Sequence, residues 1–294
     1  MEYDIDNIVK LNFMQESESI QKKLLKSLNY DNFPTFVEAK IRSLEVKKEH
    51  LTTCPPWCDD RCEVYRENKI INISQTEMYI DDKLWMIWDE KTCGTAYELF
   101  SHYYLAKGHT ICSGLGLGIR ESWLLSKPGV DKITVIENEK EVIEYHEYNK
   151  SPFLKEIEVI HGDIREYTGK CDTLLLDHYS GTDRASKVLE DVYNIQKNIE
   201  HDVLWFWPLE CIIDKAYFKY GTTNSYGPNP RSHRKAEIYD FFLKIKRSHN
   251  LHTIPDLSPE IISFFICMYY QDMSSIKRTY QSKNLMYEIT DAPK

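Results

Sequence analysis

The chain has 294 residues, of which 42% are hydrophobic and 28% are charged. This content suffices for one α/β domain with a sizeable core and a smaller appendage, and it excludes wholesale disorder. With 37 basic and 46 acidic side chains the net charge is −9, which disfavours non-specific binding to nucleic acid.

The lack of a membrane-spanning run and of a signal-peptide pattern, together with the distribution of cysteines, indicates a soluble, cytoplasmic protein. The densest apolar run, residues 261–268, is too short to span a bilayer, and the N-terminus lacks the pattern of a signal peptide. Five of the eight cysteines are scattered, most of them in apolar runs, which is typical of buried thiols in a reducing compartment. We therefore expect no disulfide framework and no membrane partner.

The first 108 residues read as an extension in two parts. Leu24, Leu25 and Leu28 lie at helical spacing and a second helix is expected over 35–49, so residues 1–50 are predicted to be a helical segment. Strands are expected over 69–74 and 77–88, around turns at 75–76 and 81–83. Residues 51–108 are therefore predicted to form a small β-rich extension.

A cluster of four potential metal ligands lies in this extension. His50, Cys54, Cys58 and Cys62 recur every four residues, and thiolate and imidazole both suit Zn²⁺. The spacing is neither that of a zinc ribbon nor that of a radical iron–sulfur motif. Incidental thiols beside a Pro-Pro-Trp turn, a structural metal and redox chemistry stay open, and we assign no metal ligand.

From residue 109 onward, strands and helices are expected to alternate. Strands are predicted at 110–112, 132–136, 157–160, 173–176 and 203–207, with helices up to 126 and over 140–149, 183–199 and 235–248. Two further strands are expected at 261–270 and 285–289. This alternation predicts a mostly parallel, doubly wound, Rossmann-like α/β domain over residues 109–294.

A glycine loop follows the first of these strands. Gly114, Gly116 and Gly118 permit a tight turn and a close backbone approach, and the next helix presents free N–H groups to a ligand. A tight turn without a ligand is the alternative.

Carboxylates end three of the following strands. Glu137, Asp163 and Asp177 fall at successive strand ends, which meet at the ligand-binding edge of a doubly wound sheet. Glu137 is placed to accept hydrogens from the two hydroxyls of a ribose.

Residues 109–208 resemble class I S-adenosylmethionine-dependent methyltransferases. The resemblance implies that the glycine loop and Glu137 hold S-adenosylmethionine, that Asp163 lies near the adenine amino group and that Asp177 faces the substrate. The predicted cofactor-binding residues are Gly114, Leu115, Gly116, Gly118, Glu137, Asp163, Ile164 and Asp177. A nicotinamide dinucleotide is the competing cofactor, but its fingerprint needs a third glycine where this chain has Ile119.

The order of features is also similar to the spermidine synthase branch of this superfamily. A β-rich piece precedes the Rossmann-like part, Arg120-Glu121 follows the glycine loop, and an acidic stretch follows the fourth strand. That branch usually carries an Asp at the position of Leu117. Methyl transfer is therefore the main expectation, with aminopropyl transfer or a non-catalytic cofactor-binding module as alternatives.

The substrate side is expected after the fourth and fifth strands. Asp177 is the predicted base or amine-positioning group, and His178, Tyr179 and Asp183 are the other catalytic candidates. The loop 219–235 is long and basic at its end, so it is a candidate for holding a small or anionic substrate. The oligomeric state is left open, with a homodimer among the states allowed.

Overall fold

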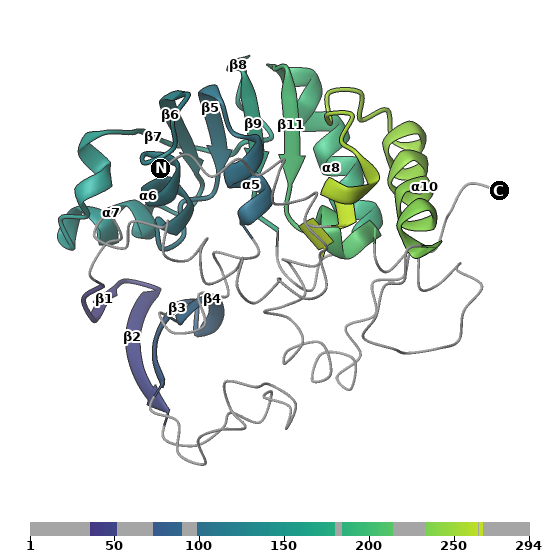
Figure 1. Ribbon diagram of the computed structural model, residues 1–294. Helices are drawn as coiled ribbons and strands as arrows, with labels where there is room; N and C mark the ends of the chain where they lie inside the picture. Colours follow the sequence, from purple (N-terminus) through teal and green to yellow (C-terminus); the bar gives the residue numbers. More distant parts are fainter. Residues whose placement is uncertain are drawn as a thin grey trace.

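Five parallel strands form the central sheet of the protein (Figure 1). The computed structural model describes residues 36–51, 73–89, 99–179, 184–213, 233–263 and 265–266. In spatial order the strands are β11 Val203–Phe206, β9 Thr173–Leu176, β5 Gly108–Ser113, β6 Val130–Glu137 and β7 Glu158–His161. All four neighbouring pairs are parallel. The Rossmann-like α/β fold expected from the sequence is confirmed.

Helices precede, follow or connect these strands along the chain, except that the described segment between β7 and β9 contains no helix. They are α5 Phe100–Leu105, α6 Ile119–Leu124, α7 Lys140–Tyr148, the short 3₁₀ helix η2 Pro152–Lys155, α8 Ala185–Asn198 and α10 His233–Ser248. The buried residues of α8, such as Val188, Val192 and Ile195, are three or four positions apart, so one face of the helix enters the core. Two short strands, β8 Gly169–Lys170 and β10 Ile199–Glu200, form a separate parallel pair.

The strands β9 and β11 are short, mostly apolar runs. Every residue of β9 and of β11 is buried, as expected for parallel strands that are covered on both faces. From β5 the chain proceeds to β6 and β7 on one side, and β9 and β11 lie on the other side of β5. The strand order therefore reverses between β5 and β9, and ligands of doubly wound sheets bind at the carboxyl ends of the strands at such a point.

An antiparallel sheet lies below the parallel sheet in Figure 1. Its strands are β1 Ala39–Ile41, β2 Leu44–Leu51, β3 Ile73–Ile80 and β4 Lys83–Asp89, paired in that order. Asp81 and Asp82 adopt left-handed φ angles of 50° and 58°, which suits the two-residue hairpin between β3 and β4. The buried residues of this sheet are continuous with the core of the parallel domain.

The helix expected over 35–49 is wrong, because these residues form β1 and β2. Leu44 and Val46 are buried and alternate with the charged Glu45 and Lys47, which is the two-residue period of a strand. Pairing with β3 along the whole of β2 decides the local structure in favour of the sheet.

Two smaller expectations are also corrected. The turn expected at 75–76 is absent, because β3 runs unbroken through these residues and only the turn at 81–82 closes the hairpin. Residues 261–263 and 265–266, expected to begin the strand 261–270, are helical, and the helix begins at residue 259. Ser258 precedes the helix as a capping residue and Pro259 is its first residue, and this start signal outweighs the apolar run.

Several expectations lie outside the described residues: the helix before residue 33, Cys54, Cys58 and Cys62, the strand at 285–289 and most of the loop 219–235. Cys112, Cys171 and Cys211 are buried, as expected. Within the described ranges, no helix combines the length and the apolar character needed to cross a membrane.

We predict that Tyr145→Phe lowers the free energy of unfolding by about 1 kcal/mol, because a part-buried hydrogen bond between the two sheet regions is lost. The Tyr145 hydroxyl on α7 donates to the carbonyl oxygen of Val37 at 3.1 Å, just before β1. Urea unfolding measures the change, with the exposed Tyr148→Phe as the matched control. Equal stability of the two variants would contradict a stabilising contact here.

Candidate functional site

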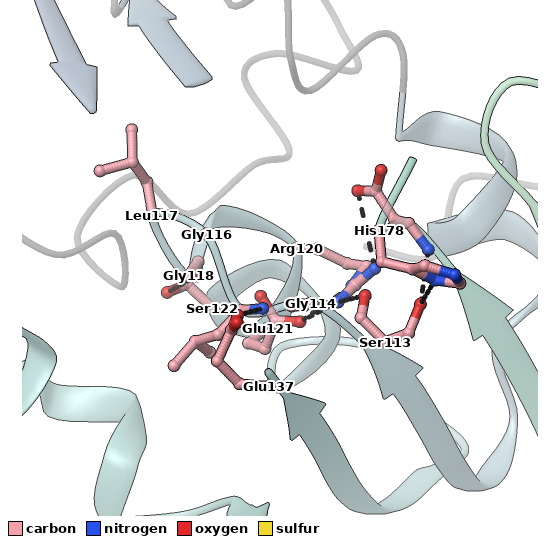
Figure 2. Close-up of polar contacts among 12 residues, drawn as sticks. Ser113, Gly114, Gly116, Leu117, Gly118, Arg120, Glu121, Ser122, Glu137 and His178 are labelled. Carbon is pink, nitrogen blue, oxygen red and sulfur yellow. Dashed lines mark hydrogen bonds and ion pairs between the residues drawn. The ribbon is translucent and has the colours of Figure 1, made fainter. Parts of the chain in front are cut away.

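The glycine loop lies at the carboxyl end of β5, beside the reversal of strand order (Figure 2). Gly114, Gly116 and Gly118 have left-handed φ angles of 73°, 49° and 71°. A Cβ on Gly114 would lie 2.6 Å from the carbonyl oxygen of Asp177, and one on Gly118 would overlap the ring of Phe153. The loop therefore requires glycine for both its conformation and its close packing.

Glu137 ends β6 and its carboxylate lies against the loop. Its Oε2 accepts a hydrogen bond from the backbone N–H of Leu115 at 2.6 Å, and Oε1 accepts one from the N–H of Glu139 at 2.7 Å. The side chain is 6% exposed. Burial raises the pKa of this carboxyl, and the backbone N–H groups of Glu139, Leu115 and Gly116 offset part of that effect.

A buried histidine supports the loop from the side of α7. The Gly116 carbonyl can only accept, so His146 Nε2 donates to it at 2.7 Å, and Nδ1 accepts from the Ser151 hydroxyl at 2.8 Å. Burial lowers the pKa of His146 to about 4, so the ring is neutral at pH 7. Sequence analysis missed this residue, because its partner lies 30 positions away.

The antiparallel sheet also contacts the loop. The Sδ of Met86 on β4 lies 3.4 Å from the backbone nitrogen of Leu117, and a Cβ on Gly116 would come within 2.9 Å of the same sulfur. Residues of the N-terminal extension therefore pack directly against the glycine loop.

Asp177 and His178 follow β9 on the other side of β5. The Ser113 Oγ accepts the backbone N–H of Asp177 at 2.9 Å and lies 2.7 Å from His178 Nδ1. The Asp177 side chain keeps 27% of its surface exposed, and burial raises the pKa of its carboxyl. The rings of His178 and Tyr179, the two predicted residues that follow Asp177 in the chain, are 4.1 Å apart. Asp183 lies outside the described residues.

Asp163 follows β7 and is held by a neighbouring cation. Arg165 contacts both of its carboxylate oxygens, with Nε 2.9 Å from Oδ1 and Nη2 2.6 Å from Oδ2. These hydrogen bonds lower the pKa of Asp163. Ile164 between them is buried. The structure thus brings the predicted acid to the expected sheet edge, but with a partner that sequence analysis did not foresee.

Further buried acids lie behind Asp177. Glu210, after β11, accepts the indole N–H of Trp205 at 3.0 Å, and burial raises its pKa to about 7. Glu121 on α6 is buried against Arg120, with Arg120 Nε donating to Glu121 Oε1 at 2.8 Å. In the sequence, these two residues stand out only as the Arg-Glu pair that follows the glycine loop; nothing there indicates that they are buried together. Among the described residues, no group of His, Cys, Asp and Glu side chains forms a metal site.

No protein-family model matches the chain, and no curated protein does. Solved structures do match. The chain is similar to spermidine synthase of Thermotoga maritima, at 16% identity over 47% of this chain and 51% of that one, with a TM-score of 0.33. It is similar to the PRMT1 enzyme–prozyme complex of Trypanosoma brucei with AdoHcy, at 18% identity over 40% and 39%, with a TM-score of 0.32.

A third match is the mitomycin 7-O-methyltransferase MmcR, at 16% identity over 38% of each chain, with a TM-score of 0.30. The matching structures come from the groups that the sequence resembles, S-adenosylmethionine-dependent methyltransferases and spermidine synthases. The chain spans about half or less of the length of each of these three.

We predict that His146→Phe changes how stability depends on pH. The folded-state pKa of about 4 lies below the unfolded value, so the unfolded chain takes up the proton first. The contribution of neutral His146 to the free energy of unfolding is complete above pH 6.5, and about 3 kcal/mol of this free energy is lost as the pH falls to 4. The variant is expected to be less stable at pH 7.5 but to approach the wild type near pH 4.

Urea unfolding at several pH values measures this difference. Because other buried histidines titrate in the same direction, only the difference between the two proteins is diagnostic. If the free energies of unfolding of wild type and variant differ by the same amount at every pH from 7.5 to 4, His146 is not neutral and buried in the folded protein.

Proposed function

We propose that the chain is an S-adenosylmethionine-dependent transferase, and that the group transferred is methyl. One observation carries the proposal: a loop with three left-handed glycines ends β5, and the buried Glu137 carboxylate lies against it. This arrangement stands where the strand order of the parallel sheet reverses.

The hydrogen-bonding capacity of Glu137 fits the ribose of such a cofactor. A carboxylate has about four acceptor positions, and the N–H groups of Leu115 and Glu139 take two of them. Each of the two oxygens thus keeps capacity to accept a further hydrogen bond, such as one from a ribose hydroxyl. Glu137 would hold the sugar, and the backbone of Gly114 to Gly118 would lie along the rest of the cofactor.

Asp163 and Ile164 would lie at the adenine end. Ile164 offers a buried apolar side chain, and Asp163 offers an acceptor for the amino group. The amino group has to replace one of the contacts made by Arg165, whose side chain is 53% exposed and therefore free to swing into solvent.

When bound, S-adenosylmethionine supplies a sulfonium-activated methyl group, which an acceptor's lone pair attacks as the carbon–sulfur bond breaks. The chain's own contribution is alignment and proton transfer. Asp177 is exposed enough to meet an acceptor, and its raised pKa makes the ionised form a stronger base. His178 and Tyr179 stand next to it as further contacts for the acceptor.

The charged groups around Asp177 restrict the charge that the reacting end of the substrate can carry. Glu121 and Glu210 are buried nearby, so we propose a small molecule whose reacting end is neutral or cationic. Any anionic part would lie away from this end.

Aminopropyl transfer is the second candidate, favoured by the antiparallel sheet that contacts the loop through Met86. Against it, Leu117 is fully buried and apolar at the position where that branch usually carries an acid. Methyl transfer therefore fits the site better.

We predict that Glu137→Ala abolishes binding of both S-adenosylmethionine and S-adenosylhomocysteine. The substitution removes the ribose acceptor and the partner of the Leu115 N–H, and titration calorimetry measures the loss. Glu200→Gln, an exposed acid on β10, is the matched control and keeps wild-type affinity. Unchanged affinity in Glu137→Ala would remove this residue from the site.

Calorimetry of the wild type with three ligands separates the candidates. We expect binding of S-adenosylmethionine, and weaker binding of its decarboxylated form and of NAD. Preference for the decarboxylated form would indicate aminopropyl transfer, and preference for NAD a dehydrogenase-like site. Failure to bind S-adenosylmethionine would contradict the proposal as a whole.

A further inference from the structure

Arg120 on α6 is a buried cation that touches the glycine loop. Its Nη2 donates to the backbone carbonyl oxygens of Gly114 at 2.5 Å and Ser113 at 3.2 Å. The side chain is 4% exposed. In Figure 2 the guanidinium extends from the start of α6 toward His178, which follows β9.

The same guanidinium faces two carboxylates. Glu121 Oε1 accepts from its Nε at 2.8 Å and from its Nη2 at 2.6 Å. Its Nη1 lies 3.6 Å from Asp177 Oδ2, an ion-pair distance longer than a hydrogen bond, and within the described ranges Nη1 has no hydrogen-bond acceptor. Arg120 therefore connects the loop backbone to the acid that follows β9.

Three other ionisable groups that interact with Asp177 do not stabilise its charge. Glu121 on α6, Glu210 after β11 and the Cys112 thiol on β5 all interact with Asp177, and each carries no charge or a negative one. Burial also disfavours the charged form of Asp177, and the Arg120 guanidinium counters that effect.

We propose that Arg120 is a positioning residue that holds the Asp177 carboxylate in place, and in its charged form, against the glycine loop. The part that this plays in group transfer rests on the proposed function. The consequence is that the loop assigned to the cofactor and the acid assigned to the substrate are fixed by one side chain. Their relative placement then does not depend on a bound ligand.

The test is a carbon-13 NMR titration of protein labelled at the Asp carboxyl carbons, with no cofactor present. Asp177→Asn identifies the resonance of Asp177. In Arg120→Gln we expect the midpoint of that resonance to move upward by about 1 to 3 pH units, because an opposite charge within ion-pair distance is removed. An unchanged midpoint would overturn the proposal.

A second variant covers the case in which Arg120→Gln fails to fold. Arg120→Gln combined with Glu121→Gln leaves no unpaired buried charge on α6, so folding is favoured. An upward but smaller shift is expected, since a repelling carboxylate is removed as well. A shift of zero or a downward shift in this protein also overturns the proposal.

Arg165→Gln is the matched control, because it removes an arginine from a carboxylate elsewhere at the same sheet edge. It is expected to raise the midpoint of Asp163 and to leave that of Asp177 unchanged. If Asp177 shifts equally in this control, the effect is one of general charge and the proposal fails. Since the titration uses no cofactor, its outcome is independent of whether S-adenosylmethionine binds.

Discussion

A buried carboxylate must be hydrogen bonded, and this requirement on Glu137 organises the candidate site. The side chain leaves the end of β6 and takes up the N–H groups of Leu115 and Glu139. It thereby joins the glycine loop after β5 to the segment before α7. The loop can follow this path because Gly114 and Gly118 adopt left-handed conformations in places too tight for a Cβ.

Other parts of the molecule hold the loop from different directions. His146 donates to the Gly116 carbonyl from α7, and Met86 packs against the loop from the antiparallel sheet. Arg120 binds its first carbonyls from α6. A loop fixed on three sides loses little further conformational freedom when a ligand binds, which is the physical basis of preorganisation.

The sequence predicted the parallel domain well, because its signals are local. The strand over 173–176 is a short apolar run bounded by acids, and the structure has it with the same bounds. The region 35–49 was mistaken for a helix because its charged residues obscured a two-residue period that pairing with β3 enforces. Apolar runs such as 261–266 suit a buried helix or strand equally.

In the candidate site, too, some residues could be predicted from local sequence signals and others could not. Glu137, Asp163 and Asp177 were predicted because the carboxyl ends of parallel strands meet at one edge. The contacts of Arg120 and His146 depend on residues that come together only in the folded chain, so no local pattern reveals them. The ionisation of buried acids is likewise a property of the tertiary structure.

A crystal structure of the protein with S-adenosylhomocysteine tests the central claim most directly. The account predicts both ribose hydroxyls within hydrogen-bond distance of the Glu137 carboxylate, with the adenine beside Asp163 and Ile164. A ligand bound elsewhere, with Glu137 contacting only the N–H groups of Leu115 and Glu139, would contradict it.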